Sequence, residues 1–143
     1  MKSEISAGII VYKEKNGRVE YLLLKGKGHT NFNFPKGTKE KGESDEKTAR
    51  RETKEETGLD DIKLEDNFKE KTYWIYYFQG NKVKKEVTYF LGETKEDKVI
   101  LSDEHEAFMW AEKEEAQKLL KFKNLNGLIE KADNFIRARS SVW

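Results

Sequence analysis

The first part of the chain alternates between apolar runs and turn residues in a way that predicts a β-hairpin. Residues 4–12 and 19–25 are rich in apolar and β-branched side chains, as strands are. Asn16-Gly17 lies between the two runs, and this dipeptide favours the tight turn that joins antiparallel strands. We therefore expect two antiparallel strands here.

A second hairpin is predicted further along the chain by the same pattern. Residues 72–78 and 84–92 are apolar or alternating runs that flank Gly80-Asn81. A short strand is also expected at 107–111. The apolar runs thus predict a sheet built around two hairpins.

The segment between the hairpins predicts a functional loop followed by a helix. Residues 26–42 are rich in glycine and lysine, hold the only proline, and surround a short predicted strand at 31–34. Ser44 is placed to cap a helix whose first turn is acidic, and Gly58 is placed to end it. We expect the loop and this helix to act together.

The last part of the chain predicts helices. Residues 113–120 fit a short helix, and apolar residues recur at helical spacing from Leu125 to Ile136, which indicates an amphipathic helix. Strands mixed with helices favour an α/β (α+β) fold with a mixed sheet covered by helices. The length of 143 residues fits one domain, which we expect to span 1–143.

Composition and charge limit the classes of function. The absence of cysteine excludes a disulfide scaffold and a thiolate metal site. The apolar run 7–11 is too short for a signal segment or a membrane span, so we expect a cytoplasmic protein without a membrane partner. The net charge of +1 makes stable nucleic-acid binding unexpected, and a polyanion would need a local basic cluster. Lys82, Lys84 and Lys85 predict a solvated face, with attraction of a polyphosphate as the alternative, and the oligomeric state is left open.

The helix at 44–58 gathers its acidic residues on one face. Glu52, Glu55 and Glu56 lie at helical neighbour positions, where like charges cost roughly 0.2–0.5 kcal/mol per pair. A hard divalent cation would remove this cost, and carboxylate oxygens are ligands that Mg²⁺ or Mn²⁺ prefers. The alternative is a solvated acidic face, but apart from Ala49 the helix has almost no apolar residue to hold it in place.

Residues 37–59, which read GTKEKGESDEKTARRETKEETGL, resemble the box motif of the Nudix family. The matching positions are Gly37, Glu43, Arg51, Glu52, Glu55, Glu56, Gly58 and Leu59. The one departure is Thr53, where the family usually has an aliphatic residue at a packing position. The resemblance implies an α/β/α sandwich that hydrolyses a nucleoside diphosphate linked to another group.

The resemblance also implies roles for the box residues. Glu52, Glu55 and Glu56 would bind the divalent metal, while Arg51 and Glu43 would form a supporting salt bridge. In such a reaction the metal neutralises phosphate oxygens and acidifies a water that attacks phosphorus. Positioning and electrostatics then supply most of the catalysis.

Three segments outside the box are similar to one branch of the family, the asymmetric diadenosine tetraphosphate hydrolases. They are Phe-Asn-Phe-Pro-Lys-Gly at 32–37, Leu-Ser-Asp-Glu-His-Glu-Ala-Phe-Met-Trp at 101–110, and Phe122-Lys123. This similarity implies cleavage of diadenosine tetraphosphate to ATP and AMP. Lys36 would then contact the polyphosphate, and Glu104 would act as a metal ligand or as the base for the attacking water.

The same similarity suggests where the substrate binds. The candidate contacts to phosphate or adenine are Lys36, His29, His105, Phe32, Tyr73, Tyr76 and Phe122, with Trp74 as a further aromatic. An adenine can stack on any of these rings. The alternative for Phe32, Trp74 and Tyr76 is packing in the core.

Three other functions stay open at this point. Two are enzymatic: removal of pyrophosphate from 5′-triphosphate RNA, and hydrolysis of oxidised nucleoside triphosphates. The third is a non-catalytic module of the same fold that only senses a nucleotide. Such a module would be free to lose metal ligands, and none is missing from the box.

Overall fold

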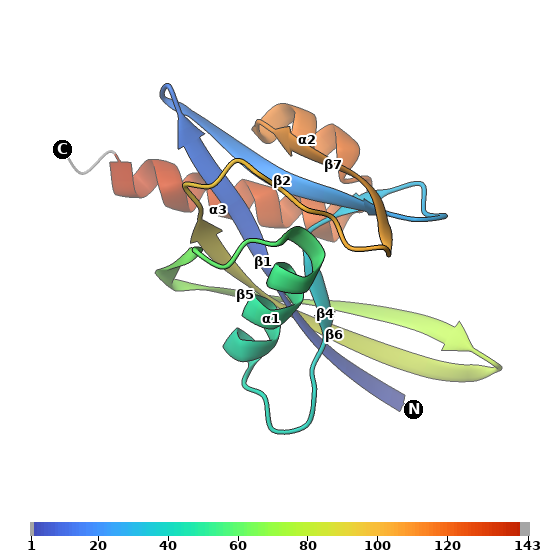
Figure 1. Cartoon of the computed structure of the whole chain (residues 1–143). Coiled ribbons are helices and arrows are strands. Elements are labelled where there is room, and N and C mark those ends of the chain that lie inside the picture. The colour runs from blue at the N-terminus through green and yellow to red at the C-terminus, as the bar shows by residue number, and fades with distance from the viewer. Residues whose placement is uncertain (1, 141–143) are drawn as a thin grey trace.

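A computed structural model describes residues 2–140, and the other residues of the expected domain, Met1 and 141–143, lie outside them. The strands are β1 (Lys2–Lys15), β2 (Arg18–Gly26), β3 (Phe32–Asn33), β4 (Lys36–Thr38), β5 (Lys63–Phe78), β6 (Asn81–Glu93) and β7 (His105–Ala111). The helices are α1 (Asp45–Thr57), α2 (Lys113–Leu119) and α3 (Lys123–Ser140). Both predicted hairpins and all three predicted helices are present (Figure 1).

The strands form one mixed sheet in the order β3-β2-β1-β6-β5, with β4 paired to β1 and β7 paired to β2. β1 and β6 run parallel, whereas the other pairs are antiparallel. The long strand β1 pairs with β4 around Ala7 and with β2 only from Tyr12 onward. The sheet therefore splits along one side of β1, and the loop around β4 enters this split.

Helices cover both faces of the sheet because β1 is apolar on both of its sides. Ile9 and Val11 pack in the cluster on the α1 side, whereas Ile10 and Tyr12 pack in the cluster on the α3 side. α1 and α3 accordingly lie on opposite faces (Figure 1). The arrangement confirms the expected mixed sheet between helices, an α+β fold of the sandwich type.

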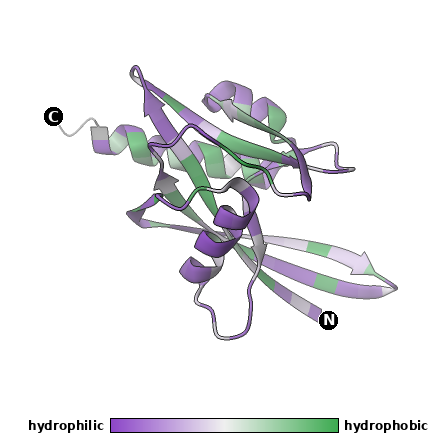
Figure 2. Ribbon diagram, in the orientation of Figure 1, coloured by the Kyte–Doolittle hydropathy of each residue, from purple (hydrophilic) through white to green (hydrophobic). Residues whose placement is uncertain are grey.

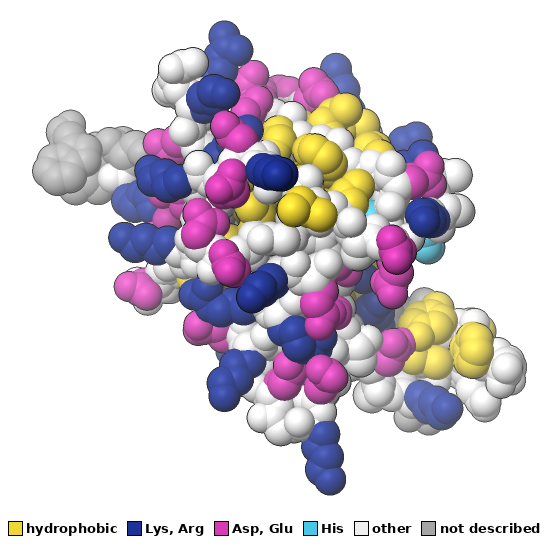
Figure 3. Space-filling view, in the orientation of Figure 1, with side chains coloured by type: hydrophobic (Ala, Val, Ile, Leu, Met, Phe, Trp, Pro, Cys, Tyr) yellow, Lys and Arg dark blue, Asp and Glu magenta, His cyan; other side chains and the backbone are white. Residues whose placement is uncertain are grey.

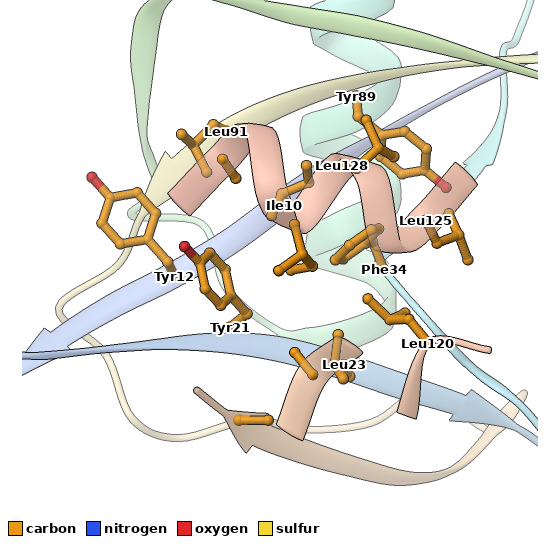
Figure 4. Packing of buried hydrophobic residues seen from close by; sticks show 14 of the residues in the cluster. Ile10, Tyr12, Tyr21, Leu23, Phe34, Tyr89, Leu91, Leu120, Leu125 and Leu128 are labelled. Atoms are coloured by element: carbon orange, nitrogen blue, oxygen red, sulfur yellow. The ribbon is translucent and has the colours of Figure 1, made fainter. Parts of the chain in front are cut away.

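The larger cluster lies under α3, whose Leu125 and Leu128 belong to the same cluster as Tyr21 and Leu23 of β2 (Figure 4). Its one buried acid, Asp133, accepts a hydrogen bond from the Tyr21 hydroxyl at 2.8 Å. A buried carboxylate without such partners would be costly. The predicted amphipathic helix is therefore confirmed.

α1 differs from α3 in burying almost no apolar surface. Figure 2 shows α1 as nearly all hydrophilic, and its buried residues are Thr48, Ala49, Thr53 and Thr57. Its predicted ends are confirmed: Ser44 accepts the N–H of Lys47, and Gly58 adopts a left-handed φ of 78°. In residues 2–140 no helix is both long and apolar enough to cross a membrane.

The second hairpin differs in two details from its prediction. Phe78 pairs with Asn81, so the turn residues are Gln79 and Gly80, both with positive φ, rather than Gly80-Asn81. β5 also begins at Lys63, well before residue 72. The early half of β5 is charged and shifts register between Leu64 and Lys69, which hides the alternation expected of a strand.

Two glycines provide a test of packing at the sheet. A Cβ at Gly92 would collide with Ile62 and lie 3.1 Å from Leu64, whereas a Cβ at the exposed helical Gly127 meets nothing within 4 Å. We expect Gly92→Ala to lower the free energy of unfolding by about 1–3 kcal/mol through overpacking. Gly127→Ala should raise it by about 0.5–1 kcal/mol, because alanine favours helix. Chemical denaturation measures both, and equal effects would contradict this packing.

Candidate active site

The site begins where α1 lies against β4. A Cβ on Gly37 would overlap the carboxylate of Glu52, so only glycine allows this close approach. The Glu52 side chain is 16% exposed, and burial raises its pKa while Arg51 opposes the rise. The glycine of the box thus makes room for the first glutamate.

Glu56 lies one turn further along the same face of α1. Its carboxylate accepts the backbone N–H of Lys36 at 3.1 Å. Burial raises the pKa of Glu56 to about 8, and the charges of Glu52 and Glu104 contribute to the rise. This group therefore needs positive charge nearby before it can ionise at neutral pH.

Glu104 reaches the same region from the loop that precedes β7. Two hydrogen bonds hold this loop: Ser102 N–H donates to the Glu56 carbonyl at 3.3 Å, and Lys27 N–H donates to the Glu104 carbonyl at 2.9 Å. The loop is thereby fixed both to the end of α1 and to the end of β2. This placement explains why the charge of Glu104 acts on Glu56.

Arg51 joins the loop before α1 to the helix. Its Nε and Nη2 donate to the two carboxylate oxygens of Glu43 at 2.7 and 3.0 Å, and Nη2 also donates to the Thr38 carbonyl. Glu43 in addition accepts from the Thr48 hydroxyl and the Glu40 N–H. The Arg51 hydrogen bonds, helped by that N–H, lower the pKa of Glu43 to about 2.

The remaining Nη1 of Arg51 points at the acidic face. It lies 3.2 Å from Glu52 and 3.3 Å from Glu55. Arg51 therefore already places one positive charge beside two of the three clustered glutamates. This partial neutralisation makes the charge cluster compatible with the folded chain.

Lys36 lies near both Glu56 of α1 and Lys85 of β6, whose charges act on its pKa in opposite directions. Burial and the neighbouring Lys85 lower the pKa of Lys36. A Cβ at Gly8, which pairs with Lys36, would collide with it, so β1 also leaves room for this strand. Lys82 and Lys84 are exposed as predicted, but Lys85 is half-buried beside Lys36.

An aromatic cavity of about 380 Å³ opens beside Lys36. Its walls come from the ends of β2, β3 and β4 and from the segment before α3. They are formed by Leu24, Gly26, Gly28, His29, Thr30, Asn31, Phe32, Asn33, Phe34, Lys36, Glu56, His105 and Phe122. Phe122 is held in place by an edge-to-face contact with Trp74, with ring centroids 5.1 Å apart.

A wider acidic cleft of about 750 Å³ adjoins this cavity. Its lining includes Glu40, Arg51, Glu52, Glu56 and Glu104. The cleft and the aromatic cavity share the residues Gly26, His29, Lys36, Glu56 and His105. One continuous depression therefore has an aromatic end and an acidic end, with cationic or titratable side chains between them.

The structure brings most of the predicted site residues to this depression. The exceptions are Glu55, Tyr73 and Tyr76, which line neither part. Tyr73 carries Lys84 over its ring at 4.8 Å, and the Tyr76 hydroxyl donates to Glu4. Both tyrosines lie on β5, on either side of the Trp74 that supports the cavity.

The donor atoms around the acidic cleft suit a hard cation. The acids are carboxylates, and burial together with the charges of Glu52 and Glu104 raises the pKa of Glu56, a rise that a nearby cation would oppose. Within residues 2–140, however, no three acidic or histidine side chains are already gathered closely enough to hold a metal ion. A bound cation would therefore draw the carboxylates together.

The comparisons with known proteins agree with this geometry. A NUDIX domain model matches residues 2–131. The chain belongs to the Nudix hydrolase family. The bis(5′-nucleosyl)-tetraphosphatase (asymmetrical) of Sus scrofa is 32% identical, with 92% of this chain and 94% of the relative covered. The enzyme of the same description from Caenorhabditis elegans is 30% identical over 92% of this chain and 95% of its own.

A solved structure of a Nudix relative supports the same grouping. The C. elegans Ap4A hydrolase binary complex superposes with a TM-score of 0.85 at 30% identity, covering 94% of this chain and 98% of that one. The predicted fold class and family are therefore confirmed.

Some features of this Nudix site were missed from the sequence. Asn33 and Phe34 line the aromatic cavity, and Lys85 lies beside Lys36. Lys85 and Lys36 belong to strands on opposite sides of β1, where they pair with Glu4 and Gly8, so their long side chains make the approach. No spacing along the chain reveals such a neighbour.

The salt bridge of Glu43 predicts a specific loss of stability in acid. Because folding lowers the pKa of Glu43 from 4.5 to about 2, the ionised carboxylate stabilises the fold above pH 4.5, and this contribution disappears as the pH falls towards 2. Glu43→Gln should lower Tm at neutral pH. The difference in Tm between this variant and the unmodified protein should shrink as the pH falls from 4.5 to 2.

Thermal unfolding followed by circular dichroism measures this difference. Glu46→Gln is the matched control, since Glu46 forms a more exposed ion pair with Arg50 on the same helix and should matter little. A Tm difference for Glu43→Gln that is constant across this pH range would contradict the assigned role of the salt bridge.

Proposed function

We propose that this protein hydrolyses diadenosine tetraphosphate asymmetrically to ATP and AMP, using Mg²⁺ or Mn²⁺. The observation that carries the proposal is the continuity of the aromatic cavity with the acidic cleft. The nucleoside would bind in the aromatic cavity, and its attached polyphosphate would extend into the acidic cleft. The names of the similar tetraphosphatases support this choice of substrate.

The aromatic cavity would hold one adenine. Phe32 and Phe122 line it and offer ring faces or edges for stacking. Tyr73 and Tyr76 line neither part of the depression, so we leave them out of the adenine site. His29, His105 and Lys36 stand between the two ends, where the phosphate chain would pass.

The acidic cleft would hold the divalent metal through Glu52, Glu56 and Glu104, which line it. Glu55 lies outside the lining beside Arg51 and would join them as the cation draws the carboxylates together. A bound cation supplies the Lewis-acid charge that neutralises phosphate oxygens and activates water. Glu56 would ionise fully in its presence, and Arg51 would keep Glu52 and Glu55 in position through the contacts of Nη1. Glu104 would be either a ligand or the base that accepts the proton of the attacking water.

The reaction itself is a displacement at phosphorus. The water oxygen forms a new bond to phosphorus as one phosphoanhydride bond breaks, and the leaving oxygen departs with the remaining phosphates. Only one end of the depression is aromatic, so the bound adenosine fixes which phosphate lies in the cleft. An unequal division of the four phosphates follows from that fixed position.

We further propose that the whole chain, 1–143, forms one domain. The family match ends at residue 131, but α3 continues to Ser140 and packs its apolar side on the same sheet. A cytoplasmic location remains a prediction from the sequence.

Product analysis tests the proposed reaction. Purified protein with Mg²⁺ and diadenosine tetraphosphate should yield ATP and AMP in equal amounts, separated by ion-exchange chromatography. Two ADP molecules, or no turnover, would exclude asymmetric hydrolysis. Parallel reactions with 5′-triphosphate RNA and oxidised dGTP rank the two rival substrates, and faster turnover of either would replace the proposed one.

A charge-removing variant tests the metal site in the same assay. Glu56→Gln keeps an oxygen that accepts the Lys36 N–H but removes the negative charge, so kcat should fall roughly 100-fold or more. Glu46→Gln on the same helix, outside the cleft, should leave kcat unchanged. Full activity of Glu56→Gln would refute the metal role and favour a different site.

The aromatic cavity can be tested separately. Phe122→Leu should raise KM about tenfold with little change in kcat, since one stacked ring is worth roughly 1–3 kcal/mol. Phe108→Leu is a matched control, because both side chains belong to residues that are 41% exposed and Phe108 lines neither part of the depression. Equal KM values for the two variants would place the adenine elsewhere.

A further inference from the structure

β5 is the edge strand of the sheet, and its first half is protected against pairing with other chains. The charged residues of this half are Lys63, Glu65, Asp66, Lys69, Glu70 and Lys71. A register shift interrupts its pairing after Leu64, and α3 reaches over it through an ion pair of 2.7 Å from Lys131 to Glu70. Charge, irregularity and a covering helix are the usual protections of an edge strand.

Beyond Trp74, which packs against Phe122, the second half of β5 has none of these protections. Residues 72–80 carry no charge, and four of their large side chains are exposed: Tyr73 by 51%, Ile75 by 58%, Tyr77 by 71% and Phe78 by 58%. The β5–β6 hairpin projects from the body of the molecule, and hydrophobic side chains gather on it (Figures 1 and 3). In residues 2–140, no strand pairs with the outer edge of β5.

We propose that two copies of this chain associate by pairing the second halves of their β5 strands antiparallel. The two-fold axis would pass through Ile75, which would lie opposite Ile75 of the second copy. Tyr73 would then lie opposite Tyr77, and Trp74 opposite Tyr76. The two β5–β6 hairpins would become four neighbouring strands, and the free backbone N–H and C=O groups would find partners.

A two-fold interface requires a surface that matches itself, and this strand does so. With the axis at Ile75, aromatic residues face aromatic residues across the seam, which is a favourable cross-strand combination. Beyond them, Lys71 would face the uncharged Gln79, and Glu70 would face Gly80. No like charges meet, so electrostatics does not oppose the pairing.

Another strand fits this edge better than a nucleic acid does. The lysines of the hairpin, Lys82, Lys84 and Lys85, lie on β6, one strand inward from the seam. Lys84 already lies over the Tyr73 ring. A nucleic acid would contact these charges but would leave the backbone groups of the edge unpaired. An added strand would pair with the backbone N–H and C=O groups of the edge and would also cover its uncharged side chains.

Sedimentation equilibrium tests the proposal on the full chain. We expect a mass of twice the 16.8 kDa of one chain at micromolar concentration. Ile75→Lys should shift the mass to that of one chain, because two lysines would meet on the axis. Ile100→Lys, at an equally exposed isoleucine outside the hairpin, should remain dimeric, and circular dichroism confirms that each variant is folded.

Monomeric sedimentation of the unmodified chain at all concentrations would overturn the proposal. A monomer whose mass rises only when single-stranded RNA is added would overturn it in favour of a nucleic-acid surface. A dimer that persists unchanged in Ile75→Lys would place the interface elsewhere and would overturn it as well.

The absence of cysteine allows the register to be tested directly. Opposed residues of antiparallel strands are close enough for a disulfide. Ile75→Cys should therefore form a covalent dimer under mild oxidation, whereas Ile100→Cys should not. Tyr77→Cys alone should stay monomeric on a denaturing gel, but should cross-link when Tyr73→Cys is added. A dimer in solution without cross-linking at Ile75 would refute the proposed seam.

Discussion

The site depends on how closely α1 lies against β4. The Glu52 carboxylate occupies the place that a side chain at position 37 would take, and Glu56 accepts the backbone N–H of the next residue back, Lys36. Apolar burial does not hold this contact, because the inner face of α1 consists of threonines and Ala49. Instead, hydrogen bonds and the loop between β4 and α1 fix the helix. Any larger residue at Gly37 would move the carboxylates out of the cleft.

Burying acids in this way is unfavourable unless positive charge is present. Arg51 meets part of that need by binding Glu43 on one side and lying beside Glu52 on the other. Glu56 still needs positive charge beside it, since burial raises its pKa to about 8. A helix that gathers negative charge beside the half-buried Lys36 is suited to a cation and a phosphate chain. The site therefore suits ligands that carry positive charge for the glutamates and negative charge for Lys36.

The same sheet carries a second feature that its helices leave uncovered. β5 and β6 are long, and α3 contacts Glu70 in the first half of β5 and borders Thr72 and Tyr73. The charged residues of β5 end at Lys71, just before this point. The sheet thus supports the cavity wall through Trp74 and exposes an apolar edge just beyond it. A single strand links the site to the surface proposed for association.

The sequence by itself determined the hairpins, the caps of α1 at Ser44 and Gly58, and the amphipathic α3, because these follow from local turn chemistry and periodicity. The box residues also gave the family. The family resemblance also predicted that Glu104 acts with the box glutamates. Only the tertiary structure decided that Lys85 lies beside Lys36 and that Phe122, unlike Tyr73, lines the cavity. These neighbours come from different strands and loops, so their proximity depends on sheet register and loop docking. Neither is encoded in the spacing of residues along the chain.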